Sequence, residues 1–260
     1  MLECVINISE GRSHAIIDSL AQSCAGDLLD IHSDPDHNRS VFTLVGVDAA
    51  RSLARAAVSA LNVNDHSGVH PRIGVVDVVP FVPLVDSTMN DARIARDEFA
   101  AWAAVELNVP SFLYGHERTL PDIRKNAWTS LMPNVGSHSP HPTAGAMCVG
   151  VREPLVAYNL WLENVDLATT RRIASVVRSA HIRTMGLQVG AFTQVSVNLI
   201  QPMIAGPNDV YKAVSQHAKV HRAELVGLLP ASVLATIPRA RWEDLDLSVE
   251  QTIEWRVTNR

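Results

Sequence analysis

The sequence of 260 residues predicts an α/β fold of the α+β type, built from two ferredoxin-like βαββαβ subdomains. Two observations indicate this fold. Apolar runs of strand length alternate with segments at helical spacing, and the order βαββαβ occurs once in each half of the chain. A stretch rich in proline, serine, glycine and histidine at 128–145 separates the halves. We therefore expect an N-terminal subdomain at 1–130, a linker at 131–145 and a C-terminal subdomain with a terminal tail at 146–260.

The N-terminal half supplies the first set of elements. Apolar or β-branched runs favour strands, and they occur at 2–6, 28–31, 41–47, 73–79 and 110–114. Segments with helical spacing occur at 13–23, 48–61 and 91–107. The polar segment 32–40 lies between two of the strands, so we expect it to form a loop.

The C-terminal half repeats this order after one additional strand at 146–151. Its other strands are expected at 155–161, 182–189, 192–199 and 225–228, and its helices at 166–179 and 208–220. The amphipathic stretch 249–257 predicts a terminal helix that packs back on the domain.

The balance of charges excludes some classes of function. The chain has 22 basic and 27 acidic residues, a formal net charge of −5, so it lacks the basic surface that binds a nucleic-acid backbone. Hydrophobic residues at 47% and charged residues at 19% are typical of a globular protein. The longest apolar stretch, 73–85, contains Asp77 and two prolines and is too short to span a bilayer. We expect neither a nucleic-acid partner nor a membrane.

The cysteines and the N-terminus predict a cytoplasmic location. Three cysteines, an odd number without a C-x-x-C spacing, indicate neither a disulfide framework nor a zinc ribbon. The first residues lack the cationic and apolar regions of a secretory signal.

The densest group of chemically useful side chains lies at 66–74. His66 and His70 are four residues apart, a spacing that can present two metal ligands on a helix. Gly68 and Pro71 disfavour a helix there, and no third ligand lies nearby, so we expect no metal.

Two interpretations of this group remain open. In the first, His70 acts as a general acid–base catalyst at the end of a strand, with Arg72 and Asp77 orienting it or binding an anion. In the second, the histidines lie in a surface turn without a chemical role.

Two further polar segments have alternative interpretations. Asp34–Ser40 lacks the spacing of a calcium-binding loop and favours a hairpin turn. The segment 136–145, followed by Arg152, is either a plain linker or a loop that contacts a ligand between the subdomains. The sequence contains no phosphate-binding glycine loop and no G-x-S-x-G motif.

Short segments distributed along the chain to about Pro230 resemble the glutamate formimidoyltransferase (formiminotransferase) family. The strongest match is Val69–Leu84, with the sequence VHPRIGVVDVVPFVPL. The other matching segments are Glu3–Arg12, Asp34–Ser40, Leu113–Gly115, His141–Ala146, Ala157–Asn159, Gln194–Leu199 and Glu224–Leu228.

The resemblance implies an activity and an architecture. Members of the family transfer a formimino group from N-formimino-L-glutamate to tetrahydrofolate in histidine degradation. They have two α/β subdomains with a ligand cleft between them and commonly form homodimers. Tetrahydrofolate is then a co-substrate, both substrates are small anions, and no metal is expected.

The resemblance also implies site residues. The catalytic histidine of the family falls on His70. The folate-contacting segments of the family fall on Gly136, Ser137, His138, His141, Thr143 and Gly145, and on Arg183 and Gly186.

The chemistry of the transfer suggests further candidates. The attacking amine loses a proton and the departing glutamate amine gains one, and an imidazole can perform both steps. We expect Asp77 to support His70, and Asp34 or Asp36 to stabilise the cationic nitrogen of the intermediate. Guanidinium groups bind carboxylates at two points, so the candidates for holding the substrate are Arg39, Arg72 and Arg152, together with Asn38.

Two other functions remain open. One is a hydrolase or transferase that acts on a related N-acyl or N-formyl amino acid without folate. The other is a non-catalytic protein of the same fold that binds a small anion.

Overall fold

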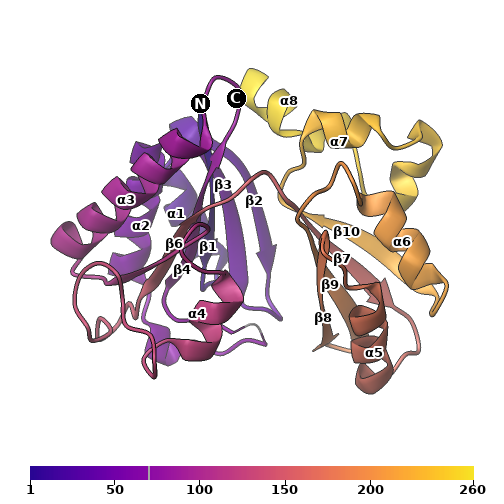
Figure 1. Cartoon of the computed structure of the whole chain (residues 1–260), viewed down its shortest axis with the longest axis horizontal. Helices are drawn as coiled ribbons and strands as arrows, with labels where there is room; N and C mark the ends of the chain where they lie inside the picture. The colour runs from indigo at the N-terminus through magenta and orange to yellow at the C-terminus, as the bar shows by residue number, and fades with distance from the viewer. Residues whose placement is uncertain (70) are drawn as a thin grey trace. The chain divides into compact units, whose positions relative to one another are not determined.

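The computed structural model describes residues 1–69 and 71–260, which form two compact units, Met1–Glu153 and Pro154–Arg260 (Figure 1). Each unit contains one β-sheet and its own helices, so the predicted α+β class with two subdomains is confirmed.

The first unit is built on a six-stranded sheet in the order β2-β3-β1-β4-β6-β5. Its strands are β1 (Leu2–Ile8), β2 (Leu28–Asp34), β3 (Arg39–Val45), β4 (Val76–Pro83), β5 (Ser111–Tyr114) and β6 (Met147–Val151). β1 pairs antiparallel with β3 and β4, whereas β6 pairs parallel with β4 and β5. The order β2-β3-β1-β4 is that of the split βαβ motif, and β6 and β5 extend it.

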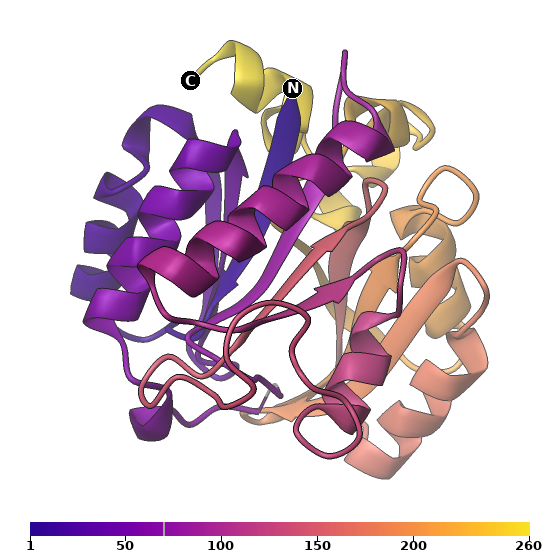
Figure 2. The ribbon, with the colours of Figure 1, turned by 60° about the vertical axis from the view of Figure 1, so that its left-hand side comes forward.

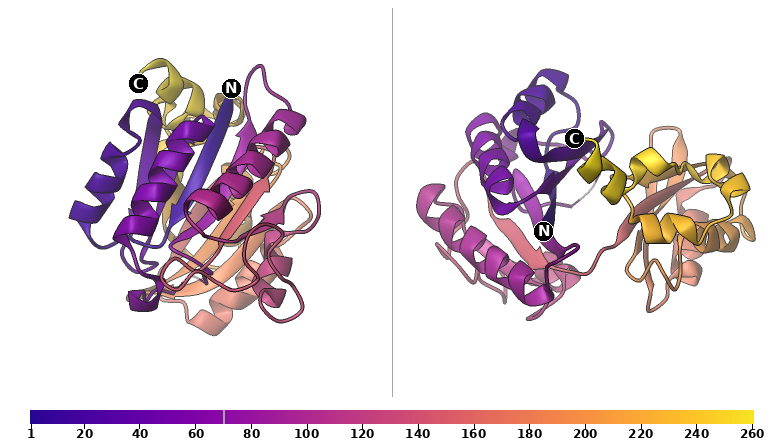
Figure 3. Two further views of the ribbon diagram at one scale, coloured as in Figure 1. Left: turned by 90° about the vertical axis from the view of Figure 1, so that its left-hand side faces the viewer. Right: turned by 90° about the horizontal axis from the view of Figure 1, so that it is seen from above.

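Three helices cover one face of this sheet (Figures 2 and 3). They are α1 (His14–Gln22), α2 (Val47–Ala60) and α3 (Met89–Glu106). The side chains of Ser13 and Thr88 cap α1 and α3. Their apolar residues share one core with alternate residues of the strands, among them Ile6, Phe42 and Phe81.

A fourth helix packs on the opposite face, against β4, β6 and β5. This helix is α4 (Leu120–Asn126), and Ile123 joins a small core with Phe112 and Cys148. A capping box between Thr119 and Asp122 starts it. The sequence analysis did not predict α4.

The predicted boundary between the subdomains is wrong. β6 belongs to the first sheet and not to the C-terminal subdomain, because it pairs with β4 and β5. The expected linker 131–145 is part of the first unit as well, since Val135 bridges to Ser111 and Gly145 bridges to Gly74. The boundary between the units lies after Glu153.

The second unit has a four-stranded antiparallel sheet in the order β10-β7-β9-β8. Its strands are β7 (Val156–Leu162), β8 (Ile182–Val189), β9 (Phe192–Leu199) and β10 (Val220–Val226). The helices α5 (Leu167–Val177) and α6 (Pro207–Ser215) pack on one face, where Tyr158, Leu160 and Val197 are buried. This is again the split βαβ order.

The C-terminal region packs on the second unit. Short helices α7 (Ala231–Ala235) and α8 (Ile253–Thr258) flank three single turns of 3₁₀ helix, and the Tyr158 hydroxyl donates to the carbonyl of Leu245 at 2.6 Å. The helix expected at 208–220 ends earlier, at Ser215, because the chain turns there into β10. No helix in the described part of the chain is both long and apolar enough to cross a membrane.

Candidate active site

The Asp77 side chain occupies a β-bulge between β1 and β4. Asn7 pairs with Val78 and Ile8 pairs with Val76, so Asp77 is an extra residue between two paired positions. A bulge turns the extra side chain out of the regular alternation, and bulges are common beside active sites. Asp77 is 1% exposed.

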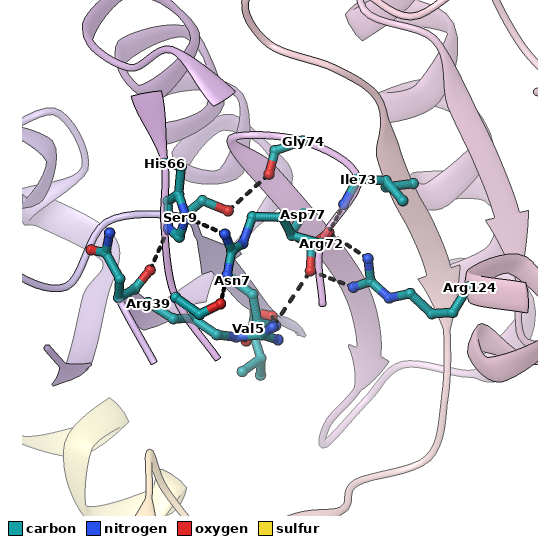
Figure 4. Close-up of polar contacts among 12 residues, drawn as sticks. Val5, Asn7, Ser9, Arg39, His66, Arg72, Ile73, Gly74, Asp77 and Arg124 are labelled. Atoms are coloured by element: carbon teal, nitrogen blue, oxygen red, sulfur yellow. Dashed lines mark hydrogen bonds and ion pairs between the residues drawn. The ribbon is translucent and has the colours of Figure 1, made fainter. Parts of the chain in front are cut away.

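Two arginines from distant elements contact the buried carboxylate (Figure 4). Arg124 on α4 binds it at two points, with Nη1 donating to Oδ1 at 2.8 Å and Nη2 donating to Oδ2. Arg39, the first residue of β3, places Nη1 3.4 Å from Oδ2, and its Nε donates to Asn7 Oδ1 at 2.9 Å. The backbone N–H of Ile73 also donates to Asp77 Oδ1, at 2.8 Å.

These contacts set the protonation state of the cluster. Burial raises the pKa of Asp77, but the hydrogen bonds and charges of Arg124, together with Arg39, more than offset it, so the pKa lies below its ordinary value. Burial lowers the pKa of Arg39 to about 10 against the attraction of Asp77, and the charges of Arg124 and Arg72 add to the lowering. The cluster is therefore ionised at neutral pH.

The segment before the bulge makes polar contacts on both sides of residue 70, through His66 and Gly68 before it and Arg72 after it. Arg72 contacts His66 Nδ1 through Nη1 and donates to the carbonyl of Gly68 at 3.1 Å. The other ring nitrogen of His66 lies 2.7 Å from the carbonyl of Asn38. Burial, with the Arg72 charge, lowers the pKa of His66 despite that contact, so the neutral imidazole is favoured.

Asn38 links three loops. It is buried, with a φ of 47°. Its amide oxygen accepts from Gly11 N–H at 2.9 Å and its amide nitrogen donates to the Ser67 carbonyl at 3.0 Å. Asp34 shapes the same turn, because Oδ1 accepts from the backbone N–H of both Asp36 and His37 at 2.8 Å. The expected hairpin turn is present but shorter than predicted: it spans 35–38, because β2 continues to Asp34 and β3 begins at Arg39.

The turn at 141–145 lies beside the segment that follows residue 70. Val75 N–H donates to the Ala144 carbonyl, and Ala146 N–H donates to the Ile73 carbonyl, both at 3.0 Å. Gly145 has a φ of +73° and approaches the Ile73 backbone so closely that a side chain would collide with it. Ser9 Oγ donates to the Gly74 carbonyl at 2.9 Å (Figure 4), which holds the same segment from β1.

The remaining expected folate residues of the first unit lie within this turn or precede it in the chain. His141 Nδ1 accepts from the N–H of Ala144 at 3.0 Å, and the Thr143 carbonyl accepts from Val63 N–H at 2.7 Å. Gly136, Ser137 and His138 are exposed.

Arg152 lies away from the Asp77 cluster. It follows the end of β6, where its N–H donates to the Phe81 carbonyl, whereas Asp77 lies near the start of the parallel strand β4. Phe81 and Asp77 are four residues apart on β4, which corresponds to about 13 Å along the strand. The structure brings Arg39 and Arg72 together near Asp77, but not Arg152.

The two expected folate residues of the second unit lie on opposite faces of β8. Arg183 is exposed, whereas Gly186 is buried beneath α5 and packs against the backbone of Arg171. Side chains three residues apart on a strand point to opposite faces.

His70, the predicted catalytic residue, lies outside the described residues. Among residues 1–69 and 71–260, no group of three or more His, Cys, Asp or Glu side chains is placed to hold a metal ion.

The sequence analysis missed Arg124 because it missed α4. The signal was present: Thr119 and Asp122 have the spacing of a capping box, and Pro121 stands near the first helical position. Arg124 and Lys125 then occupy the last turn, where cations are favoured.

Comparison with known proteins identifies the family. The family model described as "Formiminotransferase domain, N-terminal subdomain" matches residues 1–152. The chain is 33% identical over 273 residues to a glutamate formimidoyltransferase of Streptococcus pyogenes serotype M1, covering 91% of both chains. It is 31% identical to a glutamate formimidoyltransferase of Thermoplasma acidophilum, covering 92% of this chain and 91% of the relative.

A longer relative matches over part of its length. The chain is 32% identical to the formimidoyltransferase-cyclodeaminase of Rattus norvegicus, covering 90% of this chain and 51% of the relative. The chain thus spans about half the length of that protein. With the fold and the arginine-lined cluster described above, these matches show that the chain is an enzyme belonging to the formiminotransferase family of transferases.

Proposed function

We propose that this enzyme transfers the formimino group of N-formimino-L-glutamate to tetrahydrofolate, a step of histidine degradation, with His70 as the general acid–base catalyst. The names of the relatives from S. pyogenes and T. acidophilum support glutamate formimidoyltransfer. Tetrahydrofolate is a co-substrate in this proposal, the enzyme works in the cytoplasm as a homodimer, and no metal takes part.

The observation that carries the proposal is the meeting of Arg39 and Arg124 on one buried carboxylate, Asp77. Two guanidiniums and one carboxylate carry a net charge of +1. The positive charge of Arg72 is close enough to contribute to the lowering of the Arg39 pKa. A local excess of positive charge favours an anionic ligand, and planar guanidiniums favour carboxylates. N-formimino-L-glutamate carries two carboxylates, so this cluster is suited to bind it.

The contacts on both sides of residue 70 support a role for His70 beside this cluster. Arg72 bonds back to Gly68, and Ile73 bonds to Asp77, so the segment that carries His70 is joined to the cluster on its downstream side. Asp77 is then a positioning residue, because its carboxylate is already held by two guanidiniums and a backbone N–H.

The reaction needs proton transfer in both directions. An amine of tetrahydrofolate loses a proton as its nitrogen bonds to the formimino carbon, and the glutamate nitrogen gains a proton as its bond to that carbon breaks. One imidazole can accept the first proton and return it to the leaving amine. Asp34, whose turn also carries Asn38, would stabilise the positive nitrogen of the tetrahedral intermediate.

The test is turnover of N-formimino-L-glutamate with tetrahydrofolate, measured as release of glutamate and formation of formimino-tetrahydrofolate. We expect His70→Ala to lower kcat by about 10²- to 10⁴-fold with little change in either KM. His14→Ala, at an exposed position on α1, is the matched control and retains turnover.

Parallel reactions with N-formyl-L-glutamate, and with water replacing tetrahydrofolate, distinguish the alternatives. Glutamate release without tetrahydrofolate indicates a hydrolase. The absence of turnover with every donor indicates a binding protein. A kcat of His70→Ala within a few-fold of the unaltered enzyme contradicts the catalytic role of His70.

A further inference from the structure

One of the largest fully buried side chains in the described part of the chain is charged. It is that of Arg96 on α3, which is 2% exposed. A guanidinium in this position loses its hydration, so it must be paired with acceptors that the fold supplies. Neither the proposed proton transfer nor the Asp77 cluster uses Arg96.

Three residues supply acceptors to this guanidinium. Nη1 and Nη2 of Arg96 donate to the two carboxylate oxygens of Glu117, at 2.6 and 2.8 Å. Nη1 also donates to the Tyr114 carbonyl at 3.3 Å, and Nε donates to Asp97 Oδ1 at 2.8 Å. The hydrogen bonds from Arg96 hold the pKa of Glu117 below its ordinary value, so the pair is ionised at neutral pH.

The Arg96–Glu117 pair connects the two faces of the first sheet around its edge. α3 belongs to the core on one face and α4 to the core on the other, and β5 is the edge strand. Tyr114 is the last residue of β5, and Glu117 lies in the turn that follows it. A side chain of α3 therefore holds the segment that leads into α4.

The turn between β5 and α4 is also fixed against β6. Gly115 has a φ of +107°, and a Cβ there would lie 2.1 Å from the Val151 carbonyl oxygen. The Gly115 N–H donates to the Arg118 carbonyl at 2.9 Å, which closes the turn. Thr119, two residues after Glu117, caps α4. The position of Glu117 therefore sets where α4 begins.

α4 has a two-point contact between an arginine and a carboxylate near each of its ends. Glu117 lies three residues before Leu120, where α4 begins, and Arg124 in the last turn binds Asp77. Ile123 between them is completely buried. Seven helical residues span only about 10 Å, so α4 is a short and stiff connection between the two contacts.

The second of these contacts is better explained by geometry than by stability. Desolvation offsets much of the attraction within a buried ion pair, and apolar residues of similar volume often stabilise a fold as well or better. What the planar guanidinium adds is a fixed orientation of its carboxylate partner. Such precision matters beside a binding site, because a displacement of about 1 Å in a supporting element can weaken the site strongly.

We propose that the Arg96–Glu117 ion pair is a positioning device that sets where Arg124 lies in the Asp77 cluster. This inference rests on the proposed function, in which that cluster binds a carboxylate of N-formimino-L-glutamate. Arg96 and Glu117 are positioning residues, because they act through α4 and Arg124. Without the pair, α4 keeps its capping box and Ile123 its core, but the start of the helix is no longer held to α3.

The first test is steady-state kinetics of Glu117→Gln. The Glu117 side chain is 33% exposed, so this variant keeps the core around Arg96 filled. We expect the KM for N-formimino-L-glutamate to rise about three- to tenfold, with kcat and the KM for tetrahydrofolate within about twofold of the unaltered enzyme. Asp97→Asn is the matched control, because Asp97 binds the same guanidinium but lies on α3 itself and is not joined to α4.

A double-mutant cycle tests whether Glu117 acts through Arg124. In the Arg124→Lys background, Glu117→Gln should change the KM for N-formimino-L-glutamate by less than about twofold, because the contact that it positions is already lost. Effects of the two substitutions that multiply contradict an action through Arg124.

Hydrogen exchange followed by mass spectrometry measures the effect on α4 itself. We expect the backbone amides of 119–126 to exchange faster in Glu117→Gln than in Asp97→Asn or the unaltered protein. A purely structural pair predicts a lower free energy of unfolding together with unchanged KM values, and this result overturns the inference.

The outcomes separate this inference from the proposed function. Formimino transfer by the unaltered enzyme, combined with an unchanged KM for N-formimino-L-glutamate in Glu117→Gln, overturns the positioning role and leaves the proposed function standing. Where the unaltered chain binds N-formimino-L-glutamate in calorimetry without transferring its formimino group, the proposed function fails. A Kd that then rises about three- to tenfold in Glu117→Gln, but not in Asp97→Asn, still supports the positioning role.

Discussion

Arg124 and Asp77, 47 residues apart in the sequence, form a two-point ion pair in which Nη1 lies 2.8 Å from Oδ1 and Nη2 contacts Oδ2. The pair joins α4 to the bulge of β4. Arg39 on β3 contacts the same carboxylate, so one buried side chain of β4 joins β3 and α4 to that strand. This dependence leads to predictions for stability as well as for catalysis.

Replacing Asp77 by asparagine is expected to destabilise the first unit by about 3–5 kcal/mol, because it leaves two partly buried guanidiniums without the buried carboxylate that they share. Urea unfolding of the full chain measures this loss. Asp18→Asn, an exposed position on α1, is the control and should change the free energy of unfolding by less than about 0.5 kcal/mol. A similar small change in both variants contradicts the structural role of Asp77.

The same ion pair predicts acid sensitivity. The pKa of Asp77 is lower in the folded protein than the ordinary value of 3.8, so folding is favoured by the ionised form. This stabilisation is complete above pH 3.8 and is lost as the pH falls from there through the lower folded-state pKa. We expect the free energy of unfolding to fall more steeply below pH 4 in the unaltered protein than in Asp77→Asn. Parallel curves would show that the carboxylate is not held by the arginines.

Arg124→Lys should separate charge from geometry at the proposed substrate site. Lysine keeps the positive charge but loses the planar two-point contact. We expect the KM for N-formimino-L-glutamate to rise about tenfold, while the KM for tetrahydrofolate changes little. Steady-state kinetics with each substrate varied in turn measures this difference. Arg93→Lys, an exposed position on α3, is the control, and equal effects of the two variants would contradict a role of Arg124 in binding.

Asn38 is expected to matter both through the hydrogen bonds of its side chain and through its positive φ, and two substitutions separate these effects. Asn38→Gly removes its bonds to Gly11 and Ser67 but accepts the positive φ. Asn38→Ala loses the same bonds and adds backbone strain of about 1 kcal/mol. Both variants should lower kcat because the loop before residue 70 is held less firmly, and the alanine variant should unfold at lower urea. Equal stability of the two variants would show that the φ of 47° carries no strain.

Gly186 is expected to be required by packing. A Cβ at this position would lie 2.8 Å from the Cα and backbone nitrogen of Arg171 on α5. Gly186→Ala should therefore cost about 1–3 kcal/mol, measured by urea unfolding. Gly26→Ala is a matched control, because a Cβ there meets no atom within 4 Å. If the glycine instead serves folate binding alone, the unfolding curve will be unchanged and the Kd of tetrahydrofolate will rise.

Strand β10 shows where the sequence pattern was hardest to interpret. Its alternate residues Arg222 and Glu224 lie on the face turned away from the helices, so the segment lacks a continuous apolar run. The sequence analysis therefore extended the preceding helix to residue 220 and began the strand at 225. The helix ends at Ser215, and the strand begins at Val220. Polar residues on a strand can mark a site, but they also weaken the signal that identifies the strand.

The sequence by itself determined the repeated βαββαβ order, because apolar alternation and helical spacing are local properties that each segment carries. It also determined the family through the motifs around Val69–Leu84 and the other matching segments. Only the tertiary structure decided which charges meet. The pairing of Asp77 with Arg124 depends on a bulge and on the position of α4, and the pairing of Arg96 with Glu117 depends on the turn that follows β5. Contacts between distant residues depend on strand order and register, which leave no periodic trace in the chain.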